Sequence, residues 1–170
     1  MSLHAGLLAQ ARDLSVFEKK GKPKQASLRR SVSCAYYALF HLLVKEASDV
    51  LGSRLSKEAR AKLRRSFGHV EMKLVCASYA QPQSKFNPQI SILLTFPISP
   101  ELRNLAKLFV SLQDERHKAD YDIAAIYTRS YVQSIVSDLD KVFSDWQLIR
   151  TSNNAKVFLA DLLLRKSWSR

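Results

Sequence analysis

The chain has 170 residues, of which 46% are hydrophobic and 25% charged, a composition typical of a globular protein that can bury a full core. Only four glycines and five prolines are present, which argues against a turn-rich β protein. Lysine and arginine total 27 against 15 acidic residues, giving a net charge of +12. Such an excess favours a polyanionic partner such as nucleic acid, although an acidic protein, an anionic membrane or a merely solvated basic surface would also fit.

Several common classes of site are not expected in this sequence. Cys34 and Cys76 lie far apart in apolar helical contexts, so we predict two reduced, buried thiols rather than a disulfide. His4 and His69 have no partner at ligand spacing, so neither a metal nor a cofactor is expected. No glycine-rich phosphate loop is present, which excludes a P-loop or dinucleotide fold. With no membrane-length apolar run and no basic leader of a signal peptide, we expect a cytoplasmic protein without membrane contact.

Apolar residues recur at helical spacing through the first half of the chain. A first helix is predicted over about 2–19, and the sequence Gly21-Lys22-Pro23 ends it. Its inward residues are predicted to be Leu3, Leu7, Leu14 and Phe17. A second helix over about 24–51 stops at Gly52, and a third runs from an N-cap at Ser56 to about residue 79.

The second half begins with an irregular stretch over about 81–98, which contains Pro82, Pro88 and Pro97. Its apolar run over 90–96 resembles a short strand, but a single strand would lack a partner, so we predict a loop that packs apolar residues on the helices. Ser99-Pro100-Glu101 is a strong helix start and predicts a fourth helix over about 99–119. Its apolar stripe consists of Leu102, Leu105, Phe109 and Leu112.

Two further helices are predicted, over about 128–149 and about 155–166. The fold class that follows is all-α: an antiparallel up-and-down bundle of four to five long helices, with one long loop at about 81–98 and an extra C-terminal helix. We predict a bundle domain over residues 1–150. Residues 151–170 are predicted to form an amphipathic helix that packs on the bundle or on a partner.

Two segments carry a resemblance to a known family. The stretch from Leu28 to His41, LRRSVSCAYYALFH, has paired aromatics followed by phenylalanine and histidine. The stretch from Asp114 to Asp122, DERHKADYD, precedes a long amphipathic helix. In this order, the two segments resemble the signature helices of HEPN domains, and the resemblance covers about residues 1–148.

The resemblance implies a four- or five-helix bundle that often forms a symmetric dimer. Active HEPN proteins are metal-independent ribonucleases, and many are toxins paired with a nucleotidyltransferase antitoxin or parts of antiviral defence systems. Their motif is an arginine, a polar residue and, a few positions later, a histidine. Here Arg116 matches the arginine and His117 the polar position, but Tyr121 stands where the histidine is expected.

The replacement by Tyr121 bears directly on catalysis. Cleaving RNA without a metal requires a base for the 2′-hydroxyl and a cation for the phosphorane charge. Histidine, with a pKa of about 6.5, suits the base role, whereas a tyrosine with a pKa of about 10 is almost fully protonated at neutral pH. His117 follows Arg116 directly and points about 100° away on a helix. His41 is an alternative base, with a buried structural histidine as the other interpretation.

Arg116 itself has two interpretations. It extends the apolar stripe of the fourth helix by one turn, where a cation must face a cleft or be paired. A phosphate-binding role is one interpretation. An ion pair with Asp120, four residues later, is the other.

Further cations are candidates for nucleic-acid binding, with a solvated basic surface as the alternative. Lys57, Arg60 and Arg64 fall on one helical face within a dense basic run over residues 54–65. Arg29 and Arg30 open the second helix, where their charge opposes the helix dipole, and Lys118 lies beside Arg116.

Two hypotheses of function follow. In the first, the chain is a HEPN-like, RNA- or nucleotide-associated domain, either a metal-independent ribonuclease effector or its degenerate relative. In the second, it is a non-catalytic, dimeric interaction module that pairs with a nucleotidyltransferase or another partner. The second rests on Tyr121 and on the apolar C-terminal segment around Phe158 and Leu162.

Overall fold

A computed structural model describes residues 2–18, 21–81 and 86–168, and these residues form eight α-helices and no β-strand. This confirms the predicted all-α fold. The helices are α1 (Leu3–Ser15), α2 (Gln25–Leu51), α3 (Lys57–Arg64), α4 (His69–Ala80), α5 (Pro88–Ser91), α6 (Pro100–Tyr121), α7 (Arg129–Ile149) and α8 (Asn153–Trp168). Among the described residues, no helix combines the length and the apolar character needed to cross a membrane.

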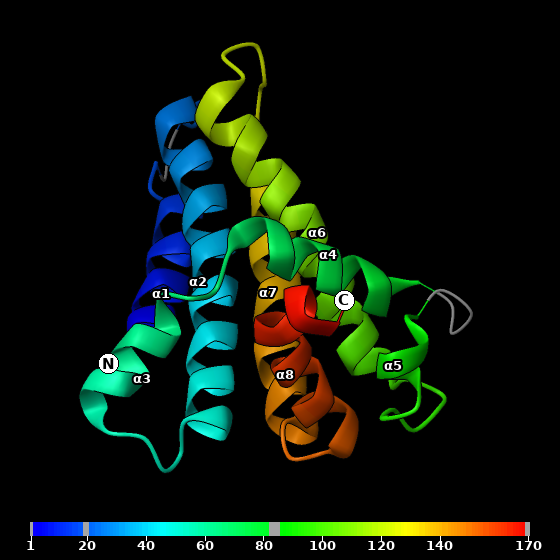
Figure 1. The fold of residues 1–170 in the computed structure, drawn as a ribbon. Helices are drawn as coiled ribbons and strands as arrows, with labels where there is room; N and C mark the ends of the chain where they lie inside the picture. The colour runs from blue at the N-terminus through cyan, green and yellow to red at the C-terminus, as the bar shows by residue number, and fades with distance from the viewer. Residues whose placement is uncertain (1, 19–20, 82–85, 169–170) are drawn as a thin grey trace. The chain divides into compact units, whose positions relative to one another are not determined.

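The chain forms two compact units, and the first comprises residues 1–42 and 108–143. It contains α1, the first part of α2, the later part of α6 and the first part of α7. Figure 1 shows α1 and α6 running in one direction and α2 and α7 in the other, so chain neighbours are antiparallel here. Its core is built from side chains that recur every three or four residues on these helices, including Val32, Tyr36, Leu39, Phe109, Leu112, Ile135 and Leu139.

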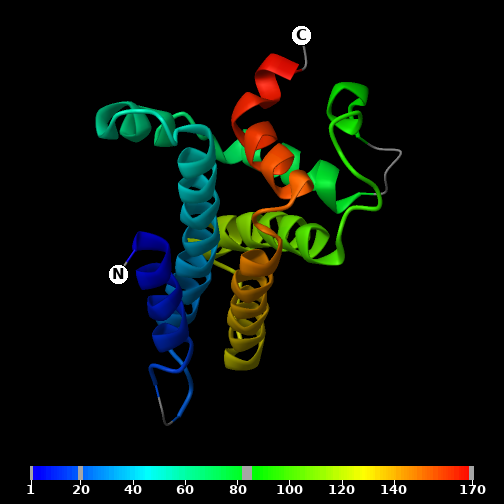
Figure 2. The same cartoon turned by 90° about the horizontal axis from the view of Figure 1, so that it is seen from below.

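The second unit comprises residues 43–107 and 144–170. Within it α8 packs against α4 and α5, and Figure 2 shows the orange-to-red α8 beside the green α4. The ring of Phe158 lies edge-on to that of Tyr79, with centroids 4.9 Å apart. Phe158 and Leu162 are buried by this packing. Phe158 and Leu162 of α8 are therefore covered within the second unit.

The capping signals read from the sequence are confirmed. The Ser56 hydroxyl accepts a hydrogen bond from the backbone N–H of Ala59 at 3.2 Å, as expected of an N-cap. Ser99 does the same for Leu102 at 3.3 Å, directly before the proline that opens α6. The α6 stripe from Leu102 to Leu112 is buried. Both cysteines are buried free thiols.

The predicted inward face of the first helix was wrong for Leu3 and Phe17, whereas Leu7 and Leu14 are half-buried. Leu3 and Phe17 are 62% and 64% exposed, and α1 ends at Ser15 rather than near Lys19, which lies outside the described residues. The buried positions are instead Leu8, Ala11 and Ser15. The small side chain of Ala11 lets α2 approach closely. The hydrogen bond from the Ser31 hydroxyl on α2 to the Ala11 carbonyl, at 2.7 Å, shows this close approach. A sequence count of large apolar residues misses such a close contact.

The third predicted helix is two helices, α3 and α4, and the predicted loop contains the short helix α5. Gly68 caps α4 in an extended conformation, with φ −98° and ψ 141°, so the chain turns where a glycine weakens a helix. Asn87 caps α5 by accepting from the Gln89 N–H at 2.9 Å. The run over 90–96 forms no strand, and it buries Ile90 and Leu94 as the loop prediction requires. Pro82 lies outside the described residues.

A side chain does not fit at Gly52, the residue directly after α2. Its N–H donates to the Ser48 carbonyl at 2.9 Å, and an added Cβ would lie 2.6 Å from that same oxygen. We expect Gly52→Ala to lower the free energy of unfolding by about 1–3 kcal/mol, as overpacking does. Urea denaturation would measure this, with the exposed neighbour Ser53→Ala as the control. Equal stability of both variants would contradict the tight packing.

Candidate functional site

Arg116 on α6 is held by side chains from α2 and from its own helix. Its Nη2 donates to the Tyr37 hydroxyl at 2.8 Å, and its Nε forms an ion pair with Asp120 Oδ2 at 2.8 Å. The Ser33 hydroxyl donates to the other oxygen of Asp120 at 2.6 Å. The predicted ion pair with Asp120 is therefore present, and Tyr37 adds a contact across the helix pair.

This site is partly open to solvent. The side chains of Arg116 and Asp120 are 24% and 29% exposed. Partial burial acts to lower the pKa of Arg116, but its hydrogen bond with Tyr37 and the negative charge of Asp120 outweigh that effect and raise it. Arg116 is a permanent cation at physiological pH. Its contacts with Tyr37 and Asp120 use only part of the donor set of a guanidinium, so it keeps donors for an anion.

The other candidate catalytic side chains gather around Arg116. The rings of Tyr37 and Tyr121 have their centroids 5.4 Å and 5.7 Å from the Arg116 Cζ. The His117 ring lies 5.0 Å from that of Tyr121. His41 stacks on Tyr37 with ring centroids 6.3 Å apart. The three motif residues and the alternative base His41 thus belong to one cluster, in which Tyr37 contacts both Arg116 and His41.

A polar stripe on α2 faces α6 and was not recognised from the sequence. It consists of Arg29, Ser33, Tyr37 and His41, each four residues from the next. This spacing places them on one helical face. Three of them contact α6 or the turn after it, and the fourth stacks on Tyr37. The regular spacing of four was the signal that could have identified Ser33 and Tyr37 as part of the site.

Arg29 closes the end of α6. Its guanidinium donates to the carbonyl oxygens of residues 119, 122, 123 and 125, at 3.1, 2.8, 3.3 and 2.6 Å. A cation at a helix C-terminus also complements the helix dipole. These hydrogen bonds give Arg29 a structural role at the end of α6, and its predicted contact with nucleic acid stays a prediction.

The turn after α6 is fixed by a second set of contacts. The Gln25 side chain pairs with the backbone of Tyr127, donating to its carbonyl at 2.8 Å and accepting from its N–H at 2.9 Å. The Tyr127 hydroxyl donates to the Glu115 carbonyl at 3.0 Å. Burial, the Glu115 charge and their hydrogen bond raise the pKa of Tyr127, which therefore stays protonated. Residues 122, 123, 125 and 127 are thus hydrogen-bonded to α2 or α6 beside the site.

The remaining candidate cations lie in different settings. Lys118 forms an ion pair with Glu115 at 2.9 Å, and Arg30 is exposed at the start of α2. Lys57, Arg60 and Arg64 belong to α3 in the second unit, a helix with no buried residue. Arg64 lies 3.4 Å from Asp49, a weak surface pair. The basic face of α3 is thus exposed, but it belongs to another part of the chain than the Arg116 cluster.

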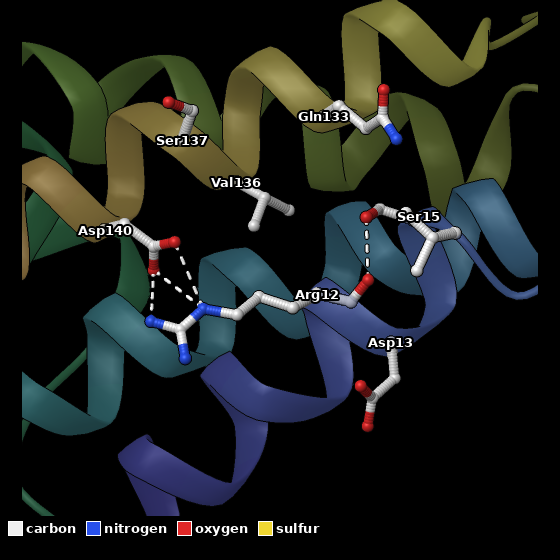
Figure 3. Close-up of a pocket in the computed structure, with 8 residues that line it drawn as sticks. Arg12, Asp13, Ser15, Gln133, Val136, Ser137 and Asp140 are labelled. Carbon is white, nitrogen blue, oxygen red and sulfur yellow. Dashed lines mark hydrogen bonds and ion pairs between the residues drawn. The ribbon is translucent and has the colours of Figure 1, made fainter.

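A separate shallow cavity of about 320 Å³ lies between α1 and α7 (Figure 3). Its cation, Arg12, is neutralised by Asp140, whose oxygens accept from Arg12 Nε and Nη2 at 2.6–3.1 Å. The hydrogen bond to Asp140 raises the pKa of Arg12. None of the predicted site residues lines this cavity. Arg12 is thus paired with a carboxylate, as Arg116 is, and a second acid, Asp13, also lines the cavity.

In the part of the chain that the structure describes, no three His, Cys, Asp or Glu side chains are grouped so that they could hold a metal ion.

Comparisons of this chain with protein-family models, with curated proteins and with solved structures gave no match.

Proposed function

We propose that the chain is a HEPN-like, RNA-associated domain in which Arg116 binds a backbone phosphate. The observation that carries the proposal is the meeting of the α2 polar stripe with Arg116, which orients the guanidinium between Tyr37 and Asp120 at a partly exposed surface. A guanidinium held in this way binds phosphate with little further loss of side-chain entropy. The net charge of +12 attracts a polyanion to the chain as a whole.

In the catalytic version of the proposal, the domain is a metal-independent ribonuclease. Arg116 would stabilise the charge that develops on the phosphorane, and Tyr121, 65% exposed, would donate a hydrogen bond to a phosphate oxygen. The base that removes the 2′-hydroxyl proton would be His117, which lies against Tyr121, or His41, which lies behind Tyr37. In the degenerate version, the same residues bind RNA or a nucleotide without cleaving it.

The test uses purified full-length protein and total RNA in buffer with a metal chelator. We expect Arg116→Ala to lower the cleavage rate about a hundredfold or more, the effect of removing one transition-state contact. If wild type binds without cleaving, Arg116→Ala should weaken binding about tenfold, as expected for a charge-assisted hydrogen bond. Lys156→Ala, which removes an exposed cation of α8, is the matched control and should change neither quantity by as much.

The outcomes separate the versions. Cleavage lost in Arg116→Ala and kept in Lys156→Ala supports the ribonuclease. Binding without cleavage, weakened only by Arg116→Ala, supports the degenerate relative. A wild-type protein that neither binds nor cleaves RNA, or variants that behave alike, would overturn the proposal.

The non-catalytic interaction module is the second candidate, and one observation favours it. Tyr121, Ile123 and Ile126 are 65%, 95% and 82% exposed in or beside the rigid turn after α6. Exposed apolar side chains held in a fixed conformation are typical of protein contact sites. The partner would be a second copy of the chain or a nucleotidyltransferase. Light scattering and copurification from the native host test this: a partnerless monomer would exclude it.

A further inference from the structure

An acidic side chain is buried where α8 packs on α4. Asp161 is 0% exposed, and neither of its carboxylate oxygens has a hydrogen-bond partner among the described residues. Its ion-pair partner is Arg165, one turn later on α8, whose Nη1 lies 3.5 Å from Oδ2. One long ion pair compensates poorly for the loss of water around a carboxylate.

Asp161 acts electrostatically on Cys76 and Tyr79, both 0% exposed on α4. The Tyr79 hydroxyl is also buried and has no hydrogen-bond partner among the residues that the structure describes. Arg165 Nη2 on α8 donates to the Ser78 hydroxyl on α4 at 3.0 Å. The residues of α5, which also packs on α8, include no titratable side chain.

Of Asp161, Cys76 and Tyr79, it is Asp161 whose charge changes near neutral pH. Burial raises the pKa of Asp161 to about 6, although the positive charge of Arg165 acts to lower it. Burial, together with the charge of Asp161, raises the pKa of Cys76 and of Tyr79, so both remain neutral. The packed form of α8 therefore binds a proton more readily than an exposed aspartate does.

We propose that protonation of Asp161 is a pH switch that controls how firmly α8 packs on α4. The N-terminal end of α8 stays attached at all pH values, because Asn154 pairs with the backbone of Thr95 at 2.6 and 2.8 Å and Asn153 donates to the Leu93 carbonyl at 2.9 Å. When Asp161 loses its proton, the remainder of α8 lifts more often and exposes the apolar contact of Phe158 and Leu162 with α4.

The direction follows from linkage. A carboxyl group whose pKa is higher in the packed state than in the open state favours packing when it is protonated. Packing is therefore firmest at acidic pH, weakens as the pH rises above the exposed value of about 3.9, and levels off above about 6. Between pH 5 and pH 8 the equilibrium constant for opening should rise about tenfold.

Hydrogen exchange of the full chain at pH 5 and pH 8 tests the proposal. In wild type, the protection factors of the α8 amides should fall about tenfold from pH 5 to pH 8. Protection factors already correct for the pH dependence of intrinsic exchange. They should not change with pH in Asp161→Asn. Glu58→Gln removes an exposed acid of the same unit and should behave as wild type.

Two further measurements keep the proposal falsifiable if Asp161→Asn does not fold. Arg165→Met removes the compensating cation, so the pH effect should become larger. The second measurement is the rate of Cys76 modification in a Cys34→Ser chain, divided by the rate for the unfolded chain at the same pH. This ratio should rise about tenfold from pH 5 to pH 8, because Cys76 is reached only when α8 lifts. The switch would be overturned if the protection of α8 in wild type did not depend on pH. It would also be overturned if Asp161→Asn kept the same pH dependence, or if Arg165→Met did not enlarge it.

Discussion

Phe109→Ala is expected to lower the free energy of unfolding by about 3–5 kcal/mol, the usual loss when a buried aromatic ring is deleted. Phe109 is 0% exposed in the centre of α6, and its ring packs against Tyr36 of α2 with centroids 5.7 Å apart. Tyr36 is the neighbour of the Tyr37 that binds Arg116. The cavity left by the substitution therefore weakens the contact between the two helices that carry the site.

Urea denaturation followed by circular dichroism measures this loss. Ile123→Ala is the matched control, because Ile123 is 95% exposed and its truncation should change the unfolding free energy by less than about 0.5 kcal/mol. A loss below about 1 kcal/mol for Phe109→Ala would contradict its place in the core.

Arg29→Met is expected to lower the free energy of unfolding by about 2–3 kcal/mol, because it leaves four backbone carbonyls at the end of α6 without their donor. Two of these, Ala119 and Ala125, are in part-buried hydrogen bonds and are least able to turn to water. The turn at 122–126 should also lose hydrogen-exchange protection and become sensitive to proteases.

Arg30→Met is the control for Arg29→Met. It removes the same charge from the next residue on α2, which is exposed. The pair of variants also separates stability from binding. If Arg29→Met lost RNA affinity while keeping its full stability, its role would be contact with phosphate, and the capping role would be wrong.

The site was only partly predictable. The motif around Arg116 was apparent as a local resemblance, and the ion pair with Asp120 followed from a spacing of four on one helix. Tyr37 and Ser33 belong to a helix some eighty residues earlier in the chain, so their contact with Arg116 and Asp120 depends on how α2 pairs with α6. The hydrogen bonds of Arg29 could not be predicted for the same reason, since its carbonyl partners lie 90 to 96 residues later in the chain.

The sequence by itself determined what depends on local spacing: the helical fold, the starts of α3 and α6 and the buried stripe of α6, since caps and periodicity act within a few residues. Tertiary structure decided the rest. Which face of α1 is buried depended on the close approach at Ala11, and the charge state of Asp161 depended on α4 excluding water from it. Packing and desolvation are properties of contacts between distant segments, and neither is encoded at any one position.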